Sequence, residues 1–184
     1  MDAGNDHFPR PEALGPRICI FGPSNSGKST LAVAIDRALG VPAIHLDLLH
    51  HRPNTDWVPR APREFERLHD DAIAGESWAM EGNYSRLMPQ RLRRATGIVW
   101  VDTAMPGNLW RYFRRTLFER GRIGTLEGGH DSIKWLMINH IAFVQPKRRS
   151  QLENAIKASG LPFARIESFI ALHRFYTQWG LKRP

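Results

Sequence analysis

The stretch that decides the fold is Gly22 to Thr30, GPSNSGKST, which directly follows the apolar run RICIF at residues 17–21. Its glycines, lysine and hydroxyl residue match the spacing G-x-x-x-x-G-K-[ST], typical of a loop whose backbone N–H groups surround a polyphosphate. The motif needs a strand before it and a helix after it, and both are predicted from the flanking residues. A Gly-rich turn that binds nothing would leave Lys28 at a helix start, where a cation opposes the helix dipole.

We therefore assign the whole loop to nucleotide binding. Lys28 is expected to reach the outer phosphates and to take part in catalysis, and the hydroxyl of Ser29 is expected to ligate Mg²⁺. The predicted ligands are ATP and Mg²⁺. The assigned residues are Gly22, Pro23, Ser24, Asn25, Ser26, Gly27, Lys28, Ser29 and Thr30.

Strands and helices are predicted to alternate along the whole chain. The predicted strands lie at 17–21, 41–47, 77–81, 97–102 and 163–167, and the predicted helices at 29–39, about 65–75, 106–120, 132–144, 147–159 and 168–179. This alternation implies an α/β fold with three layers, a five-stranded parallel sheet with helices on both faces.

The chain is predicted to form one domain. Its 184 residues fall in the usual single-domain range. Residues 1–16 are rich in Pro, Gly and Asp and are expected to be a flexible tail, so the domain comprises residues 17–184. A helical lid is expected at about 120–150, because residues 121–130, GRIGTLEGGH, contain four glycines.

Composition narrows the partners without naming them. The net charge of +8 favours anionic partners such as nucleotides, nucleic acid or phosphorylated metabolites. No apolar run approaches the roughly 20 residues that span a bilayer, and the lone Cys19 fits a reducing cytoplasm. Nucleic acid stays possible as a partner, although no helix-turn-helix signature, zinc module or basic tail is found. Nothing in the sequence fixes the oligomeric state.

Three acids follow predicted strands, at the edge where parallel sheets bind ligands: Asp47, Glu81 and Asp102. Mg²⁺ prefers oxygen ligands and keeps several waters, so Ser29 and one water-linked carboxylate would suffice. SWAME and IVWVD both place an acid after four mostly apolar residues, which leaves the metal partner open between Glu81 and Asp102. The plainer alternative is that either acid caps the following helix.

Arginines form a stripe on the predicted helix at 106–120. Arg111, Arg114 and Arg115 share the face opposite to its apolar residues. We expect them to be catalytic, closing over the phosphoryl group as negative charge spreads in the transition state, with Arg148 and Arg149 closing from the other side. The alternative is an ordinary solvated surface.

Two aromatic residues and three histidines lie near the same edge. Trp57 and Tyr84 fall in predicted loops, where a ring can stack on a base or another flat acceptor. For His45, His50 and His51 a packing role is expected rather than a metal site, because no cysteine or carboxylate spacing supports zinc.

Several segments together resemble the DNA topology modulation proteins, small P-loop kinase-like relatives of adenylate kinase. These segments are the loop, HLDLLH at 45–50, Trp57, WAMEGNYSR at 78–86 and VDTAMPGNLWRYFRR at 101–115. The resemblance covers about residues 17–120. The chain departs from the family at His51, about where the first of two family tryptophans lies, and at Glu81, where the family usually has Asp.

The resemblance implies roles for individual residues. Glu81 would orient Mg²⁺ through water, Arg86 would contact acceptor phosphate, and Asn83 and Tyr84 would lie at the substrate. Asp47 would hold the acceptor hydroxyl in line, the role of an acid at this place in related kinases. The alternative for Asp47 is a cap or turn residue.

The sequence thus predicts an ATP-dependent phosphotransferase. The γ-phosphate would pass to a nucleotide, a nucleoside or another small acceptor held between Asp47, Trp57 and Glu81. The alternative is a nucleic-acid-associated or regulatory ATP-binding protein of the DNA topology modulation type, without small-molecule kinase activity. No motif decodes the acceptor, because pocket shape determines it.

Overall fold

The structure, a computed structural model, describes residues 8–103 and 145–184. The helices predicted at 106–120 and 132–144 lie outside the described residues, as does most of the predicted lid. Among the described helices, none is long and apolar enough to cross a bilayer.

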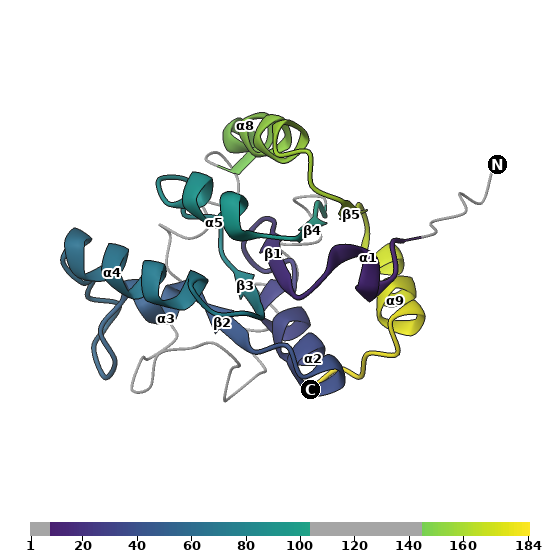
Figure 1. The fold of residues 1–184 in the computed structure, drawn as a ribbon, viewed down its shortest axis with the longest axis horizontal. Helices are drawn as coiled ribbons and strands as arrows, with labels where there is room; N and C mark the ends of the chain where they lie inside the picture. Colours follow the sequence, from purple (N-terminus) through teal and green to yellow (C-terminus); the bar gives the residue numbers. More distant parts are fainter. Residues whose placement is uncertain (1–7, 104–144) are drawn as a thin grey trace.

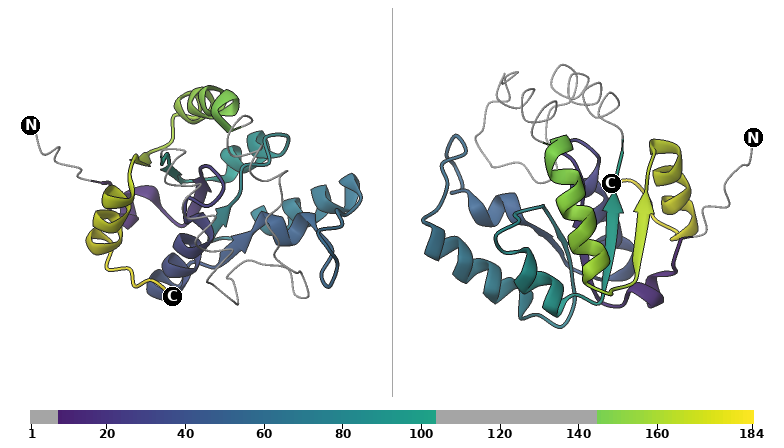
Figure 2. Two further views of the ribbon diagram at one scale, coloured as in Figure 1. Left: turned by 180° about the vertical axis from the view of Figure 1, so that it is seen from behind. Right: turned by 90° about the horizontal axis from the view of Figure 1, so that it is seen from above.

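Five parallel strands form one sheet, as predicted. They are β1 (Arg17–Phe21), β2 (Ala43–His45), β3 (Trp78–Glu81), β4 (Gly97–Val101) and β5 (Phe163–Ile166). Their order is β2-β3-β1-β4-β5, and every neighbouring pair is parallel. All carboxyl ends therefore meet at one edge; the parallel arrows of β4 and β5 are clear in the right-hand view of Figure 2. The register places Ile20 opposite Glu81, so the end of β3 lies beside the start of the phosphate loop.

Helices cover both faces of the sheet and complete the three layers (Figure 1). One face carries α2 (Lys28–Leu39) and α9 (Phe169–Gln178), and the other carries α4 (Pro62–Ile73), α5 (Met88–Arg94) and α8 (Gln145–Ala158). Two short helices complete the described chain, α1 (Pro11–Leu14) before β1 and α3 (Leu46–His50) directly after β2.

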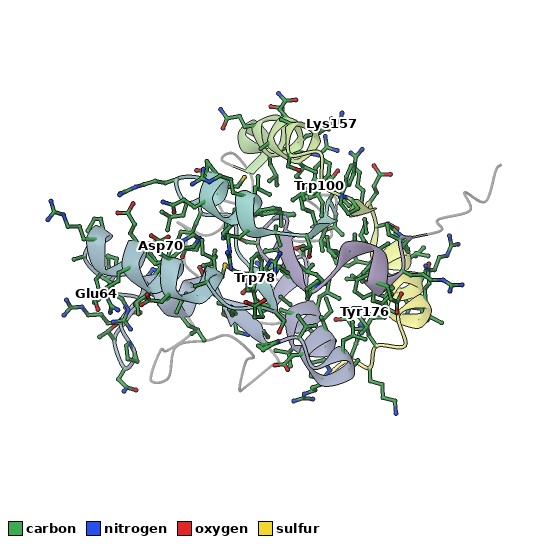
Figure 3. The ribbon with its side chains drawn as sticks, in the orientation of Figure 1. Glu64, Asp70, Trp78, Trp100, Lys157 and Tyr176 are labelled. Atoms are coloured by element: carbon green, nitrogen blue, oxygen red, sulfur yellow. The ribbon has the colours of Figure 1, made fainter. Side chains whose placement is uncertain are left out.

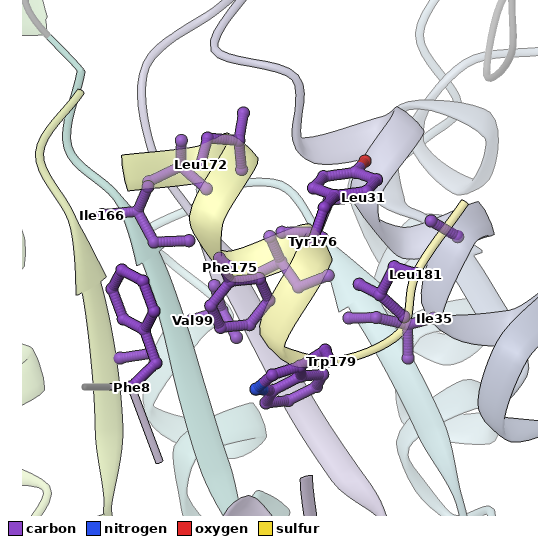
Figure 4. Packing of buried hydrophobic residues seen from close by; sticks show 14 of the residues in the cluster. Phe8, Leu31, Ile35, Val99, Ile166, Leu172, Phe175, Tyr176, Trp179 and Leu181 are labelled. Carbon is purple, nitrogen blue, oxygen red and sulfur yellow. The ribbon is translucent and has the colours of Figure 1, made fainter. Parts of the chain in front are cut away.

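Alternate residues of the strands supply two separate cores. Ile18 and Ile20 of β1 belong to the core under α2 and α9, whereas Cys19 and Phe21 belong to the core under α4 and α5. We call these the α2/α9 core and the α4/α5 core. Figure 4 shows the first, where side chains of α9 interlock with those of α2 and the strands. In Figure 3, Trp78 and Trp100 mark the second core and Tyr176 the first.

The prediction of a flexible tail at 1–16 is wrong for residues 8–16. Phe8 is buried, and its ring lies 5.2 Å from that of Phe175. Gln178 donates to the Phe8 carbonyl at 2.6 Å, and the indole N–H of Trp179 donates to Pro9 at 2.9 Å. Apolar burial and these bonds fix a segment that looks unstructured by composition. Residues 1–7 lie outside the described residues.

The second predicted strand is too long. β2 ends at His45, and Leu46 begins the five-residue helix α3, so Asp47 lies in the first turn of a helix rather than at a strand end. The alternating apolar pattern of VPAIHLD fits a strand, but Leu46 is fully buried in the α4/α5 core. Helix α5 was not predicted, because its seven residues are mostly basic or polar.

Candidate functional site

The loop between β1 and α2 has the backbone that its sequence demands. Gly22 has φ +148°, and a Cβ there would lie 2.2 Å from the carbonyl oxygen of Val101. Asn25 and Gly27 also have positive φ. The hydroxyl of Ser26 is fully buried and has no hydrogen-bond partner in the described chain. The positive-φ backbone of this loop, together with Lys28 and Ser29 at the start of α2, fits a nucleotide polyphosphate.

Lys28 begins α2 and bends back over the loop. Its Nζ donates to the carbonyl of Pro23 at 2.7 Å. Its charge also favours the ionised form of Glu81. The ammonium therefore lies against the loop backbone and close enough to Glu81 to affect its ionisation.

Ser29 and Glu81 are in direct contact. The Ser29 hydroxyl donates to Oε1 of Glu81 at 3.0 Å, and Nδ1 of His45 lies 3.0 Å from the same oxygen. Glu81 is 4% exposed. Burial acts to raise the pKa of Glu81, but the bond from His45, the charge of Lys28 and the bond from Ser29 bring it below its usual value. The carboxylate is therefore ionised at neutral pH and lies beside the hydroxyl predicted to ligate Mg²⁺. This pair of oxygen donors fits Mg²⁺.

Asp102 has different neighbours. Arg149 donates to both of its carboxylate oxygens, at 2.7 and 2.6 Å, and Arg165 donates twice to Oδ2, at 3.0 and 2.7 Å. The guanidinium of Arg165 also lies 4.5 Å from the ring centroid of Trp100. Of the two acids predicted for the metal, the structure brings Glu81 to Ser29 and engages Asp102 with arginines. Arg149, predicted to close over the phosphates, is one of those partners; the side chain of Arg148 lies outside the described residues.

Asn83 clamps the first residue of the loop. The backbone N–H of Gly22 donates to Oδ1 of Asn83 at 3.2 Å, and Nδ2 of Asn83 donates back to the Gly22 carbonyl at 3.0 Å. This residue was predicted at the substrate, and the structure gives its amide to the phosphate loop instead.

Asp47 and Tyr84, both predicted to lie at the acceptor, are in direct contact. The Tyr84 hydroxyl donates to Oδ1 of Asp47 at 2.6 Å. Burial, together with the charge of Asp47, raises the pKa of Tyr84, so the phenol keeps its proton. The glycine at position 82 lets the turn after β3 lie close to α3. Its φ is +126°, and a Cβ there would lie 3.0 Å from Cβ of Leu46.

His50 and His51 pack with aromatic rings, whereas His45, the strand histidine for which packing was predicted, contacts the carboxylate of Glu81. The ring of His50 lies 4.8 Å from that of Phe65 and 5.0 Å from that of Tyr84, and the ring of His51 lies 5.1 Å from that of Trp57. His50 Nδ1 lies 3.1 Å from His51 Nε2. Among the described residues, no group of three His, Cys, Asp or Glu side chains could hold a metal ion.

Arg86 lies at the surface. Its side chain is 69% exposed and pairs with Glu66 at 3.2 Å. The arginine stripe Arg111, Arg114 and Arg115 lies outside the described residues. Of the predicted acceptor-side and lid arginines whose side chains the structure describes, Arg86 pairs with Glu66 and Arg149 with Asp102.

Arg91 is the residue near the site that the sequence did not single out. It is fully buried on α5, and its Nη2 donates to the carbonyl of Asn83 at 2.7 Å. The sequence carried no signal for it, because a basic run such as RLRR normally marks an exposed surface.

No family model and no curated protein sequence matches the chain. Solved structures do. A shikimate kinase from Acinetobacter baumannii, in complex with shikimate, has a TM-score of 0.56 at 14% identity, over 88% of this chain and 92% of that one. A gluconokinase from Sinorhizobium meliloti 1021 has a TM-score of 0.52 at 15% identity, over 90% and 89%. A shikimate kinase from Bacteroides thetaiotaomicron has a TM-score of 0.51 at 16% identity, over 88% and 97%.

These likenesses establish the fold. The chain has the parallel α/β fold of these solved structures, with helices on both faces of a five-stranded sheet. The resemblance to DNA topology modulation proteins stays a prediction.

Proposed function

We propose that this chain is an ATP-dependent phosphotransferase that moves the γ-phosphate to a small acceptor. One observation carries the proposal, the bond of 3.0 Å between the Ser29 hydroxyl and the buried, ionised carboxylate of Glu81. It joins the last part of the phosphate loop to the acid at the end of β3, which lies beside β1 in the sheet. A loop that only binds phosphate does not require a buried anion beside its serine.

In this proposal Ser29 ligates Mg²⁺ directly and Glu81 holds it through water, while Lys28 and the loop backbone bind the phosphates. When bound, Mg²⁺ and ATP supply a phosphoryl group whose charge is partly neutralised. The contribution of the chain is to hold both partners in line, because the transition state of such a transfer is loose.

Asp47 holds the acceptor. Its Oδ1 is bonded to the Tyr84 hydroxyl at 2.6 Å, which fixes the plane of the carboxylate. The second oxygen would then orient the acceptor hydroxyl and take its proton as the acceptor oxygen bonds to the γ-phosphorus, while the bond from that phosphorus to the ADP oxygen breaks and ADP leaves. Trp57 and the arginines Arg86, Arg111, Arg114 and Arg115 remain candidate acceptor and lid residues.

The acceptor class stays broad in the proposal: a nucleotide, a nucleoside or another small molecule. The structural neighbours are kinases named for gluconate and shikimate, which supports including small hydroxylated acids. A screen of nucleoside monophosphates, nucleosides and hydroxylated metabolites for ADP release tests it. We expect at least one compound to raise ADP release above the level with ATP alone, and Lys28→Ala to abolish the increase.

The second candidate is a nucleic-acid-associated or regulatory ATP-binding protein, which the net charge of +8 favours. Binding of ATP with no acceptor that raises ADP release would support it. DNA binding that falls steeply with salt and shows no sequence preference would mark counterion release and leave the kinase proposal standing.

A further inference from the structure

Arg91 is an enclosed cation that the proposed transfer leaves without a role. Its side chain is 0% exposed, and two of its nitrogens, Nε and Nη1, have no partner within residues 8–103 and 145–184. Nη2 donates to the carbonyl of Asn83 at 2.7 Å. Burial lowers the pKa of Arg91 to about 10, which leaves it protonated at neutral pH. The guanidinium lies 5.4 Å from the ring centroid of Phe21, a weak compensation for lost hydration.

Packing alone does not account for this charge. Removing a guanidinium from water is costly, and replacing a buried charge by an apolar side chain of similar volume is often neutral or stabilising. Arg93, two residues along α5, is exposed. An arginine on this helix can thus remain in solvent, as Arg93 does. Arg91 is instead buried, where it donates to the carbonyl of Asn83.

That carbonyl lies in a strained turn. Gly82 has φ +126° and Tyr84 has φ +27°, a value that a residue with a side chain adopts only when its surroundings enforce it. The carbonyl of Asn83 belongs to the peptide group that joins Asn83 to Tyr84. A bond from Arg91 to this oxygen fixes the plane of the peptide and so restrains the φ angle of Tyr84.

The turn carries three of the contacts on which the site depends. Glu81 accepts from Ser29, Asn83 clamps Gly22, and Tyr84 donates to Asp47. The nucleotide side and the acceptor side of the site are thus attached to four consecutive residues.

We propose that Arg91 is a positioning residue, which fixes the Asn83–Tyr84 peptide and thereby holds the phosphate loop and Asp47 in one geometry. The inference rests on the proposed function, which identifies the phosphate loop as the nucleotide side and Asp47 as the acceptor side. The contacts themselves are independent of any ligand.

Hydrogen exchange of the Gly22 amide tests this without nucleotide, since that N–H donates to Asn83. The variants are Arg91→Met, Arg91→Lys and, as a matched control on the same helix, Arg93→Met. The amide of Leu172, which donates to the carbonyl of Ser168 at the start of α9, reports on the α2/α9 core, away from the turn. We expect Arg91→Met to speed exchange at Gly22 by about tenfold to a hundredfold, as for loss of one charge-assisted bond. Leu172 should be unchanged, Arg91→Lys intermediate and Arg93→Met like the wild type.

Unchanged protection of Gly22 in Arg91→Met would overturn the inference. Equal acceleration of hydrogen exchange at Gly22 and Leu172 would also overturn it, because Arg91 would then only support the core. If Arg91→Met does not fold, the same comparison is made in Arg91→Lys. With an acceptor in hand, kcat/KM should fall by about tenfold or more while the melting temperature stays that of Arg93→Met. A wild type with protected Gly22 that transfers no phosphate would contradict the proposed function and leave the positioning result intact.

Discussion

The two cores of the molecule differ in whether their buried polar side-chain atoms have hydrogen-bond partners. In the α2/α9 core, the indole N–H of Trp179 donates to Pro9. In the α4/α5 core, the indole N–H of Trp78 is buried without a partner in the described chain. The same holds for Nε2 of His69 on α4 and for two nitrogens of Arg91 on α5. Outside the phosphate loop, every unpaired buried side-chain atom that the structure describes belongs to α4, β3 or α5.

This difference indicates that the α2/α9 core mainly stabilises the fold, whereas the α4/α5 core also supports the candidate site. An unsatisfied buried polar group costs about 1–3 kcal/mol, so a face that retains several is not optimised for stability alone. That face also carries α3 and the turn after β3, with Asp47 and Tyr84. Real proteins break local rules mainly at functional sites, which is the pattern here. Substitutions near the α4/α5 core should therefore change activity before stability, and those in the α2/α9 core the reverse.

The largest effect is expected from Asp47→Asn. This change keeps the shape and the bond to Tyr84 but removes charge and basicity. We expect the single-turnover rate of transfer at saturating ATP to fall by about 10²–10⁴, the range for a positioned general base, with ATP affinity nearly unchanged.

Asp71→Asn is the matched control, because Asp71 lies exposed on α4 and pairs with the exposed Arg67. Its rate should equal that of the wild type. If Asp47→Asn transfers at the wild-type rate, Asp47 has no part in the chemistry and the search passes to Glu81 and Asp102.

A substitution in the α2/α9 core should lower stability and leave the transfer rate unchanged. Phe175 is fully buried in the α2/α9 core and contacts Phe8 and Trp179. Phe175→Ala is expected to lower the free energy of unfolding by about 3–5 kcal/mol, the usual cost of such a cavity. Urea denaturation measures this loss, and the transfer rate per folded molecule should be unchanged. A rate that falls while stability holds would erase the distinction between the two cores.

The smallest effect concerns pH. Burial lowers the pKa of His69 below 6.5, against the pull of Asp70, and burial and His51 lower that of His50. The unfolded chain therefore takes up protons at these sites more readily than the folded one. The free energy of unfolding should fall as the pH drops below about 6.5, until the folded-state pKa values are reached.

Urea denaturation at pH about 7.5 and about 5.5 measures this loss. His69→Gln should make it smaller, because one of the two titrating sites is gone. Equal losses in wild type and variant would show that the buried histidine of α4 does not titrate in this way.

Most of the sheet was predictable because its strands have local signals. Four of the five strands were placed within a residue or so, since each is a short apolar run before a glycine, an acid or the phosphate loop. Contacts distant in sequence caused the errors. Phe8 packs against the distant Phe175. Leu46, which is fully buried, begins a helix where the alternating pattern fits a strand. Helix α5 is too short and too basic to show a helical period.

The site was predictable where backbone shape requires particular residues. Gly22 and Ser29 could be found by spacing alone. The preference for Glu81 over Asp102 followed from the family resemblance, since the residues alone left it open, and the structure now brings Glu81 to Ser29. Arg91 was missed because a basic run such as RLRR normally marks a surface, and only the three-dimensional packing shows that one of its arginines is enclosed.

The central claim is that the loop after β1 binds Mg·ATP for transfer. The most direct test is a calorimetric titration of Mg·ATP into the wild type, Lys28→Ala and the control Lys182→Ala, which changes an exposed residue near the C-terminus. We predict binding by the wild type and the control, affinity weaker by about tenfold to a hundredfold for Lys28→Ala, and equal melting temperatures for all three. Equal affinity in all three proteins, or no binding by the wild type, would contradict the account.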